Sequence, residues 1–226
     1  MSIQAIIFDA YGTLFDVYSI GATAEKLFPG RGEAIAALWR DKQIEYTRLR
    51  SMSSTYKPFW EVTQDALVFT FRKLGIDLSV DAQQSLMGQY AKLPAFPENK
   101  SVLQQLQQQG FKLAILTNAN SQMLELAVKS AGLASYFDHL LSVESVRKFK
   151  TAPEAYQLGT DVFGLPAKHI LFVSSNCWDV CGASWFGFTT FWANRANAPL
   201  EKLGVTPDGE GRSLEDLLMF VEARRH

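Results

Sequence analysis

The sequence is poor in cysteine, and none of its hydrophobic runs is long enough to cross a membrane. Its two cysteines, Cys177 and Cys181, stand four residues apart without a second pair that would complete a zinc site. Two cysteines do not make a disulfide framework, so we expect a reducing, cytoplasmic location. The N-terminus has no basic segment before a long apolar stretch, so we expect no secretory signal and no membrane partner.

Charge of one sign is also lacking, because 22 lysines and arginines nearly balance 23 aspartates and glutamates, for a net charge of −1. This balance gives no signal for binding nucleic acid. Two groups of short motifs are absent as well: the G-x-S-x-G turn of many serine hydrolases, and the G-x-G-x-x-G and P-loop patterns of nucleotide-binding proteins. These classes of protein are therefore disfavoured.

The sequence does contain short apolar segments that alternate with helical patterns. With 47% hydrophobic residues the chain has enough apolar material for a full core. Strands that alternate with helices favour parallel pairing through right-handed crossovers. We therefore expect an α/β fold whose core is a parallel, Rossmann-like sheet flanked by helices, with strands at residues 3–8, 112–116, 139–143, 170–173 and 189–192.

One long segment breaks this alternation. Residues 16–92 show helical spacing of apolar side chains and no clear buried strand. Turn-forming residues divide the segment at Pro29-Gly30, at residues 56–58 and at residues 75–77. We expect residues 16–92 to form an inserted helical cap subdomain, with residues 1–15 and 93–226 forming the α/β core domain.

Polar side chains follow four of the expected strands. Taken alone, Asp9 could cap the next element, and Lys150 could be an ordinary surface lysine. The carboxyl ends of parallel strands meet at one edge of a sheet, however, and ligands bind there. We therefore expect a site made by Asp9, Thr117, Asn118, Lys150, Ser174, Asn176 and Asp179.

Four segments carry a resemblance to a known family. They are IIFDAYGTL, LAILTNAN, VRKFK and LFVSSNCWD, which contain in turn Asp9, Thr117, Lys150 and Asp179. In this order they resemble the four motifs of the haloacid dehalogenase superfamily. The similarity is greatest to its L-2-haloacid dehalogenase branch and extends over nearly the whole chain.

Two positions distinguish this branch from the phosphatases of the superfamily. Tyr11 stands where the phosphatases carry a second aspartate as general acid, and Ser175 stands where they carry a carboxylate that holds Mg²⁺. A departing halide needs no proton, whereas losing acid catalysis of phosphate-ester cleavage costs about 10²- to 10⁴-fold. The resemblance therefore implies no metal and no cofactor. A Mg²⁺-dependent phosphatase and a non-catalytic binding protein of the same fold stay as alternatives.

The resemblance implies hydrolytic dehalogenation of short (S)-2-haloalkanoic acids to (R)-2-hydroxy acids. Asp9 would attack C2 with inversion and form an aspartyl ester, and water positioned by Asp179 would hydrolyse that ester. The partners implied are a small 2-haloacid, a halide product and a second copy of the chain, because relatives are often homodimers through the helical insertion.

Individual roles are also implied by the resemblance. Arg40 would bind the halide with help from Asn118, although without the family match it would be taken for a solvated helix residue. The residues implied to be catalytic are Asp9, Thr13, Arg40, Thr117, Lys150, Tyr156, Ser174, Asn176 and Asp179. Those implied to contact the substrate are Ala10, Tyr11, Arg40, Ile44, Phe59, Thr117, Asn118 and Trp178.

Three positions depart from the pattern of the branch. Asp41 stands beside Arg40 where glutamine is expected, and an aspartate facing the pocket would repel halide or hold Arg40 in an ion pair. Thr117 replaces the more usual serine, and Thr151 replaces the usual proline after Lys150. These departures leave the preferred halogen and chain length open.

Overall fold

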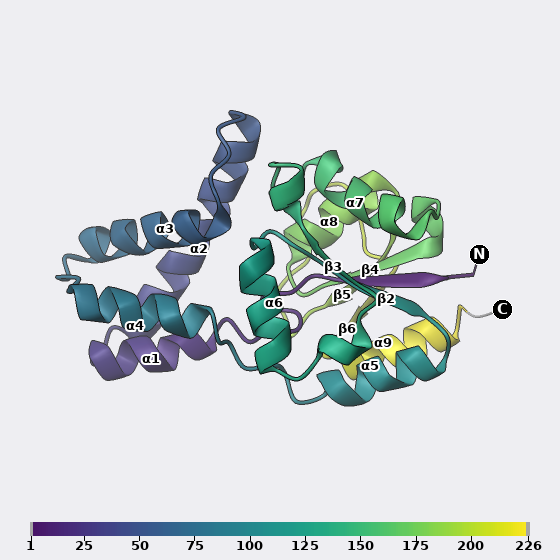
Figure 1. The fold of residues 1–226 in the computed structure, drawn as a ribbon, viewed down its shortest axis with the longest axis horizontal. Coiled ribbons are helices and arrows are strands. Elements are labelled where there is room, and N and C mark those ends of the chain that lie inside the picture. Colours follow the sequence, from purple (N-terminus) through teal and green to yellow (C-terminus); the bar gives the residue numbers. More distant parts are fainter. Residues whose placement is uncertain (1, 225–226) are drawn as a thin grey trace.

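Six parallel strands form one sheet in the computed structural model, which describes residues 2–224. Their order is β3-β2-β1-β4-β5-β6, so β1 lies inside the sheet, between β2 and β4 (Figure 1). In this register Ile7 pairs with Ala114 on one side and with Phe172 on the other. The strands are β1 (Ala5–Phe8), β2 (Lys112–Thr117), β3 (His139–Ser142), β4 (Ile170–Ser174), β5 (Thr189–Ala193) and β6 (Gly209–Gly211).

Helices cover both faces of this sheet (Figure 1). Helices α7 (Pro153–Phe163) and α8 (Cys177–Phe186) lie on one face, and α5 (Asn99–Gln108) and α9 (Leu214–Glu222) lie on the other. All four side chains of β1 are buried as a result. A strand covered on both faces requires a continuous apolar run, and this explains why AIIF does not alternate with polar residues.

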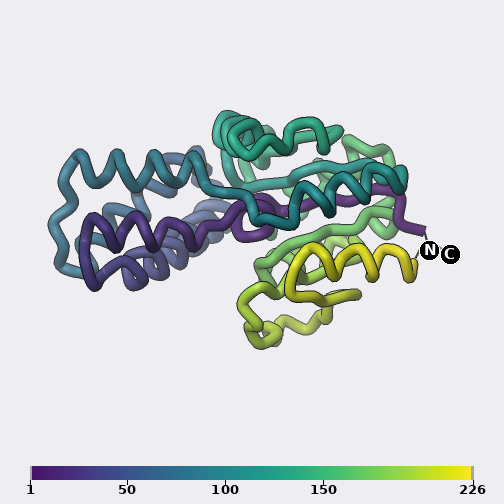
Figure 2. Tube along the Cα trace, turned by 90° about the horizontal axis from the view of Figure 1, so that it is seen from below, coloured from purple at the N-terminus to yellow at the C-terminus, as the bar shows by residue number. Residues whose placement is uncertain are grey.

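The chain between β1 and α5 is helical. It forms α1 (Ser19–Leu27), α2 (Gly32–Met52), α3 (Phe59–Leu74) and α4 (Val80–Tyr90). Figure 2 shows these helices as a body that projects from one end of the core. The expected turn segments lie between them, and Gly75 ends α3 in the left-handed conformation that glycine adopts at low cost. The limits of a cap at residues 16 and 92 stay a prediction.

The two chain segments that join the helical body to the core run side by side (Figure 2). Phe15 and Ala95 form an antiparallel bridge, and the backbone N–H of Asp16 donates to the carbonyl of Pro94 at 2.8 Å. Within residues 2–224, none of the helices combines the length and the apolar character needed to span a membrane.

The expected α/β class with a parallel sheet is confirmed, and all five expected strands are present. Three further elements are not among those expected. Strand β6 has only three residues, two of them glycine, so it carries no hydrophobic signal. Helix α8 is apolar on most sides and gives no amphipathic period. Helix α9 begins with a capping box formed by Ser213 and Asp216, a signal that the sequence does contain.

Candidate active site

The position of Asp9 follows from the buried strand before it. Its backbone N–H continues the pairing with β4 by donating to the carbonyl of Val173 at 2.8 Å. The chain then turns sharply at Gly12, where φ is +94° and an added Cβ would lie 3.0 Å from the Ser175 hydroxyl. This turn brings the Thr13 hydroxyl back to donate to Asp9 Oδ2 at 3.0 Å. The local sequence therefore fixes the carboxylate at the carboxyl edge of the sheet.

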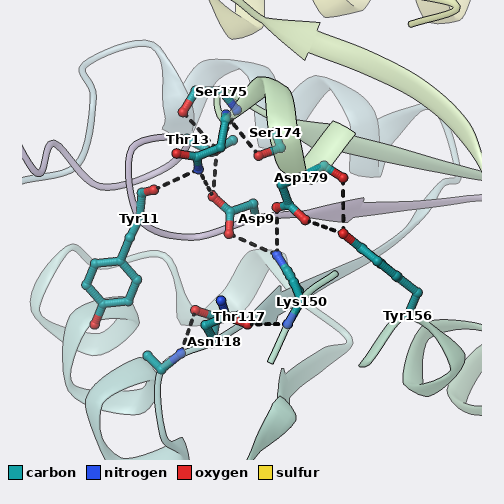
Figure 3. A network of polar contacts seen from close by, with 12 residues as sticks. Asp9, Tyr11, Thr13, Thr117, Asn118, Lys150, Tyr156, Ser174, Ser175 and Asp179 are labelled. Atoms are coloured by element: carbon teal, nitrogen blue, oxygen red, sulfur yellow. Dashed lines mark hydrogen bonds and ion pairs between the residues drawn. The ribbon is translucent and has the colours of Figure 1, made fainter. Parts of the chain in front are cut away.

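Lys150 joins two buried carboxylates at this edge (Figure 3). Its Nζ lies 3.0 Å from Asp9 Oδ1 and 2.9 Å from Asp179 Oδ2, and the lysine is only 1% exposed. The Tyr156 hydroxyl donates to the other oxygen of Asp179 at 2.8 Å. One ammonium thus offsets the repulsion between two acids that the chain brings together from β1 and α8.

Burial and these contacts shift the pKa values of the cluster. Burial raises the pKa of Asp179 to about 6, against the pull of the Lys150 ammonium. Burial alone would lower the pKa of Lys150, but the charges of Asp179 and Asp9 outweigh it and the pKa is raised. Burial also raises the pKa of Tyr156 well above its usual value. At neutral pH Lys150 is therefore charged, Tyr156 is a hydrogen-bond donor, and Asp179 is close to its titration range.

The second oxygen of Asp9 is held from the start of α8. Asn176 donates its Nδ2 to Asp9 Oδ2 at 3.0 Å. The hydroxyl of Ser174 accepts the backbone N–H of Asn176 at 3.1 Å and bonds neither carboxylate among the described residues. The family resemblance implies that Ser174 is catalytic, and any effect of its hydroxyl on Asp9 passes through Asn176.

Arg40 reaches the core from α2. Its Nη2 lies 3.3 Å from both the Tyr11 carbonyl and Asn176 Oδ1, and its Nη1 donates to Gln43 Oε1 at 2.8 Å. Asp41 is exposed, and no ion pair joins it to Arg40 within the described part of the chain. Asp41 therefore does not neutralise Arg40 through an ion pair in this structure.

Thr117 and Asn118 follow β2, as expected. The Thr117 hydroxyl accepts the backbone N–H of Ala119 at 3.2 Å. The side-chain oxygen of Asn118 accepts the backbone N–H of Lys150 at 2.9 Å, so Asn118 positions the lysine segment. We find no hydrogen bond between Asn118 and Arg40 among residues 2–224, and a shared role at a halide stays a prediction.

These side chains surround a small cavity of about 20 Å³, which is room for one or two water molecules. Its walls combine the carboxylate of Asp9 and the guanidinium of Arg40 with apolar and aromatic groups. The lining residues are Asp9, Tyr11, Arg40, Ile44, Thr47, Phe59, Thr117, Asn118, Asn176 and Trp178. All except Thr47 are among the residues expected from the sequence.

The other expected residues stand behind this lining. Thr13 and Lys150 touch the carboxylate of Asp9 directly, Asp179 lies one contact further away through Lys150, and Tyr156 lies beyond Asp179. Ala10 is fully buried next to Asp9 but does not line the cavity. The structure therefore separates the expected site into a wall that faces the cavity and a polar cluster that supports Asp9.

Comparison with known proteins identifies the family. The sequence profile described as haloacid dehalogenase-like hydrolase matches residues 3–187. The chain belongs to this family. An (S)-2-haloacid dehalogenase from Pseudomonas sp. (strain YL) is 46% identical over 220 residues, which cover 97% of this chain and 95% of the relative.

Solved structures agree with this assignment. The crystal structure of an L-2-haloacid dehalogenase superposes with a TM-score of 0.97 at 57% identity, covering 98% of this chain and 100% of the other. The L-2-haloacid dehalogenase from Xanthobacter autotrophicus, with chloropropionic acid covalently bound, superposes with a TM-score of 0.88 at 36% identity. That match covers 97% of this chain and 98% of the other.

Two polar residues of this haloacid dehalogenase-like hydrolase contact Arg40 and were not expected from the sequence. Gln43 accepts from its Nη1, and the Tyr90 hydroxyl lies 3.3 Å from the same atom. Gln43 stands three residues after Arg40 on one helix, a spacing that places both side chains on the same face. That spacing was a usable signal. No local signal points to Tyr90, because it comes from α4, fifty residues away.

Proposed function

We propose that this chain hydrolyses short (S)-2-haloalkanoic acids to (R)-2-hydroxy acids, with inversion at C2 and without a metal. The observation that carries the proposal is the carboxylate of Asp9, held at both oxygens by Lys150, Thr13 and Asn176 in a small cavity that Arg40 also lines. Relatives named (S)-2-haloacid dehalogenase support it, as does the structure of one with chloropropionic acid covalently bound.

The first half-reaction is a displacement at carbon. One oxygen of Asp9 attacks C2 from the side opposite the halogen, the new C–O bond forms as the carbon–halogen bond breaks, and the electron pair leaves with the halide. Two anions must approach each other in this step. Lys150 and Arg40 bring two positive charges against the two negative charges of Asp9 and Asp179, so the substrate anion enters a site without net negative charge.

Arg40 is proposed to receive the halide. A guanidinium at the departing halogen acts where negative charge develops, which favours the transition state over the bound substrate. The neighbouring walls of Ile44, Phe59 and Trp178 exclude water and strengthen such contacts. We propose that Thr117, with the backbone N–H groups near Ala10 and Asn118, holds the substrate carboxylate by charge-assisted hydrogen bonds.

The second half-reaction is hydrolysis of the ester on Asp9. Asp179 takes a proton from water as the water oxygen adds to the side-chain carbonyl carbon, and collapse then breaks the acyl–oxygen bond. The alkoxide of the hydroxy acid takes that proton back from Asp179 as it leaves, the water oxygen stays on Asp9, and the second proton of the water goes to solvent as the Asp9 carboxylate forms again. A pKa of about 6 suits Asp179 to accept a proton near neutrality. Lys150 and Tyr156 hold its carboxylate in place.

Two positions favour this reaction over phosphate-ester hydrolysis. Ser175, whose neutral hydroxyl lies 3.3 Å from that of Thr13, stands where the phosphatases carry a carboxylate that holds Mg²⁺, and a neutral hydroxyl is a weaker ligand for that cation. Tyr11 stands at the position of the phosphatase general acid, and burial raises its pKa well above the usual range. A phenol is a far weaker acid than a carboxylic acid, so it is a poor donor to a leaving alkoxide.

We also propose a homodimer in a reducing compartment, the cytoplasm. Large apolar side chains are exposed on the helical body, among them Tyr18 at 68% and Met52 at 83%, and they favour contact with a second copy. Sedimentation equilibrium should give twice the chain mass, and a single-chain mass would contradict the dimer.

The cysteines Cys177 and Cys181 are buried and free, which supports the proposed reducing compartment.

The decisive measurement is halide release from both enantiomers of 2-chloro- and 2-bromopropionate. We expect release from the (S) acid alone, an (R) product, no change with EDTA, and loss of activity in Asp9→Ala. The exposed Asp77→Ala serves as the matched control. In a single turnover in ¹⁸O-labelled water with enzyme in excess, the label should stay on Asp9.

Three outcomes would contradict the proposed function. They are halide release that survives Asp9→Ala, halide release that requires Mg²⁺, and label found directly in the hydroxy acid. Magnesium-dependent release of phosphate from an aryl phosphate, without release of halide, would indicate the phosphatase instead.

A further inference from the structure

Behind Arg40 lies a buried chain of polar side chains to which the proposed reaction assigns no role. Gln43 is 0% exposed, and its Oε1 accepts from Arg40 Nη1 at 2.8 Å and from the Tyr90 hydroxyl at 2.7 Å. Its Nε2 donates to the Thr63 hydroxyl at 2.7 Å. Thr63 donates in turn to the Phe59 carbonyl at 2.7 Å. The chain of contacts therefore leads from Arg40 to the backbone of α3.

The Phe59 carbonyl, at the end of this series of contacts away from Arg40, determines the direction of the hydrogen bonds from Thr63 to Arg40. The Phe59 carbonyl can only accept, so the Thr63 hydroxyl must donate its single proton there. Thr63 then has only lone pairs for Gln43, which must turn its N–H toward Thr63 and its oxygen toward Arg40. Arg40 has no acceptor atoms, so it can meet only that oxygen. Helix α3 thereby fixes which way the amide points.

A neutral amide is the group that this place requires. A carboxylate at position 43 would pair with Arg40 and cancel the charge offered to an anion. An apolar side chain would leave the hydroxyl of Tyr90 without its present acceptor and Nη1 of Arg40 with only that hydroxyl at 3.3 Å, and unpaired buried polar groups are costly. Gln43 therefore holds the guanidinium without neutralising it.

We propose that Gln43, set by Thr63 and Tyr90, is a positioning residue that holds the charge of Arg40 where the leaving halide develops its own. The proposal rests on the proposed function and specifies its leaving-group dependence. Chloride leaves carbon less readily than bromide, so its departure depends more on a correctly placed cation. Disturbing Gln43 should therefore slow the reaction of chloroacids more than that of bromoacids.

Helix α3 supplies a matched pair of variants for this test. Thr63 and Thr70 are both 0% exposed, and each hydroxyl donates to the carbonyl four residues earlier, at 2.7 Å to Phe59 and 2.8 Å to Ala66. Only Thr63 also accepts from Gln43. Thr63→Val breaks the chain of contacts that orients Gln43, and Thr70→Val removes an equivalent hydroxyl that has no link to Arg40.

The measured quantity is the rate of halide release in a single turnover with enzyme in excess. Under these conditions the displacement is observed separately from ester hydrolysis. For (S)-2-chloropropionate we expect Gln43→Met and Thr63→Val to be roughly 10- to 100-fold slower than the unmodified chain, the usual penalty for a misplaced catalytic group. For the bromoacid the loss should be several-fold smaller. Thr70→Val should match the unmodified chain with both acids. Equal slowing by the two threonine variants, or equal slowing of both acids, would overturn the proposal.

A second measurement separates this proposal from the proposed function. Sodium bromide is substituted for sodium gluconate at constant ionic strength. The midpoint temperature of thermal unfolding is then recorded without substrate for the unmodified chain, Thr63→Val and Thr70→Val. Bromide should stabilise the unmodified chain and Thr70→Val but not Thr63→Val. This result would support the positioning role even if no haloacid were turned over. No bromide effect on the unmodified chain, or an equal effect on both variants, would overturn it.

Discussion

At the scale of single residues, the site depends on Lys150. Its ammonium lies within 3.0 Å of Asp9 and of Asp179, in surroundings where neither acid is well solvated. Breaking a buried ion pair leaves an uncompensated charge and costs about 3–5 kcal/mol. Burying these three charged groups also costs desolvation free energy. The proposed reaction explains this cost, because it requires both carboxylates to be ionised and held at fixed positions for the displacement and for the ester hydrolysis.

Tyr156→Phe tests the role of Asp179 through its pH dependence. The Tyr156 hydroxyl donates to Asp179 and lowers its pKa, so the variant should raise that pKa above about 6. Because the carboxylate form accepts the proton from water, the acid limb of the pH–rate profile should move to higher pH. Ester hydrolysis followed from pH 5 to 8 checks this shift. Tyr136→Phe lies just before the start of β3, at the edge of the sheet opposite the site, and should leave the profile unchanged. An unshifted profile in Tyr156→Phe would contradict the assignment.

At the scale of elements, the turn between β1 and the helical body carries the nucleophile and its first hydrogen-bond donor. Gly12 has a positive φ in this turn, a conformation that glycine adopts at low cost, and the turn returns Thr13 to Asp9. Thr13 also accepts the backbone N–H of Ser175 at 2.8 Å and so ties the turn to the end of β4. Two adjacent parallel strands are thereby joined at the site.

A pair of glycine variants tests this turn. Gly12→Ala forces a residue with Cβ into φ +94°, beside the Ser175 hydroxyl at 3.0 Å, and should cost about 1–2 kcal/mol or more together with most of the activity. Gly88→Ala lies at an exposed position of helix α4 with open space around the new Cβ, and should stabilise the fold by about 0.5–1 kcal/mol. Urea unfolding and halide release measure both. Full activity in Gly12→Ala would contradict the role of the turn.

At the scale of the whole molecule, the site exists only where the helical body meets the core. Arg40 comes from α2, whereas its partners Tyr11 and Asn176 come from the edge of the sheet. A second contact lies at the far end of α2, where the Ser51 hydroxyl accepts the backbone N–H of Phe149 at 2.7 Å. Phe149 directly precedes Lys150, so this contact ties the position of α2 to the segment that carries the lysine.

Ser51→Ala should loosen that segment. Removing the acceptor of a partly buried N–H costs about 1–3 kcal/mol, which corresponds to roughly 5- to 150-fold faster local opening. Hydrogen exchange is best read at the amide of Lys150, because its own acceptor, Asn118, is unchanged. The control is Ser53→Ala, whose hydroxyl bonds only the end of its own helix and the residues just after it. Equal exchange in the two variants would show that Ser51 does not hold the segment.

Some strands and site residues of this protein could be predicted from the sequence, and others could not. Five strands were predictable because each is a short apolar run bounded by turn residues. Strand β6 was not, because its residues Gly209–Gly211 form a strand only by pairing with β5. Most residues that line the cavity were predictable from motifs that follow strands. Tyr90 was not, because its place beside Arg40 depends on how α4 packs against the other helices.

The sequence by itself determined the order along the chain of strands β1 to β5, the acid at the end of β1 and the polar groups after three further strands. These features are local, since hydrophobic period, turn residues and caps act within a few positions along the chain. Only the tertiary structure decided that Lys150 bonds both Asp9 and Asp179, and that Tyr90 lies beside Arg40. These contacts join residues far apart in the chain, so they depend on packing that no local pattern encodes.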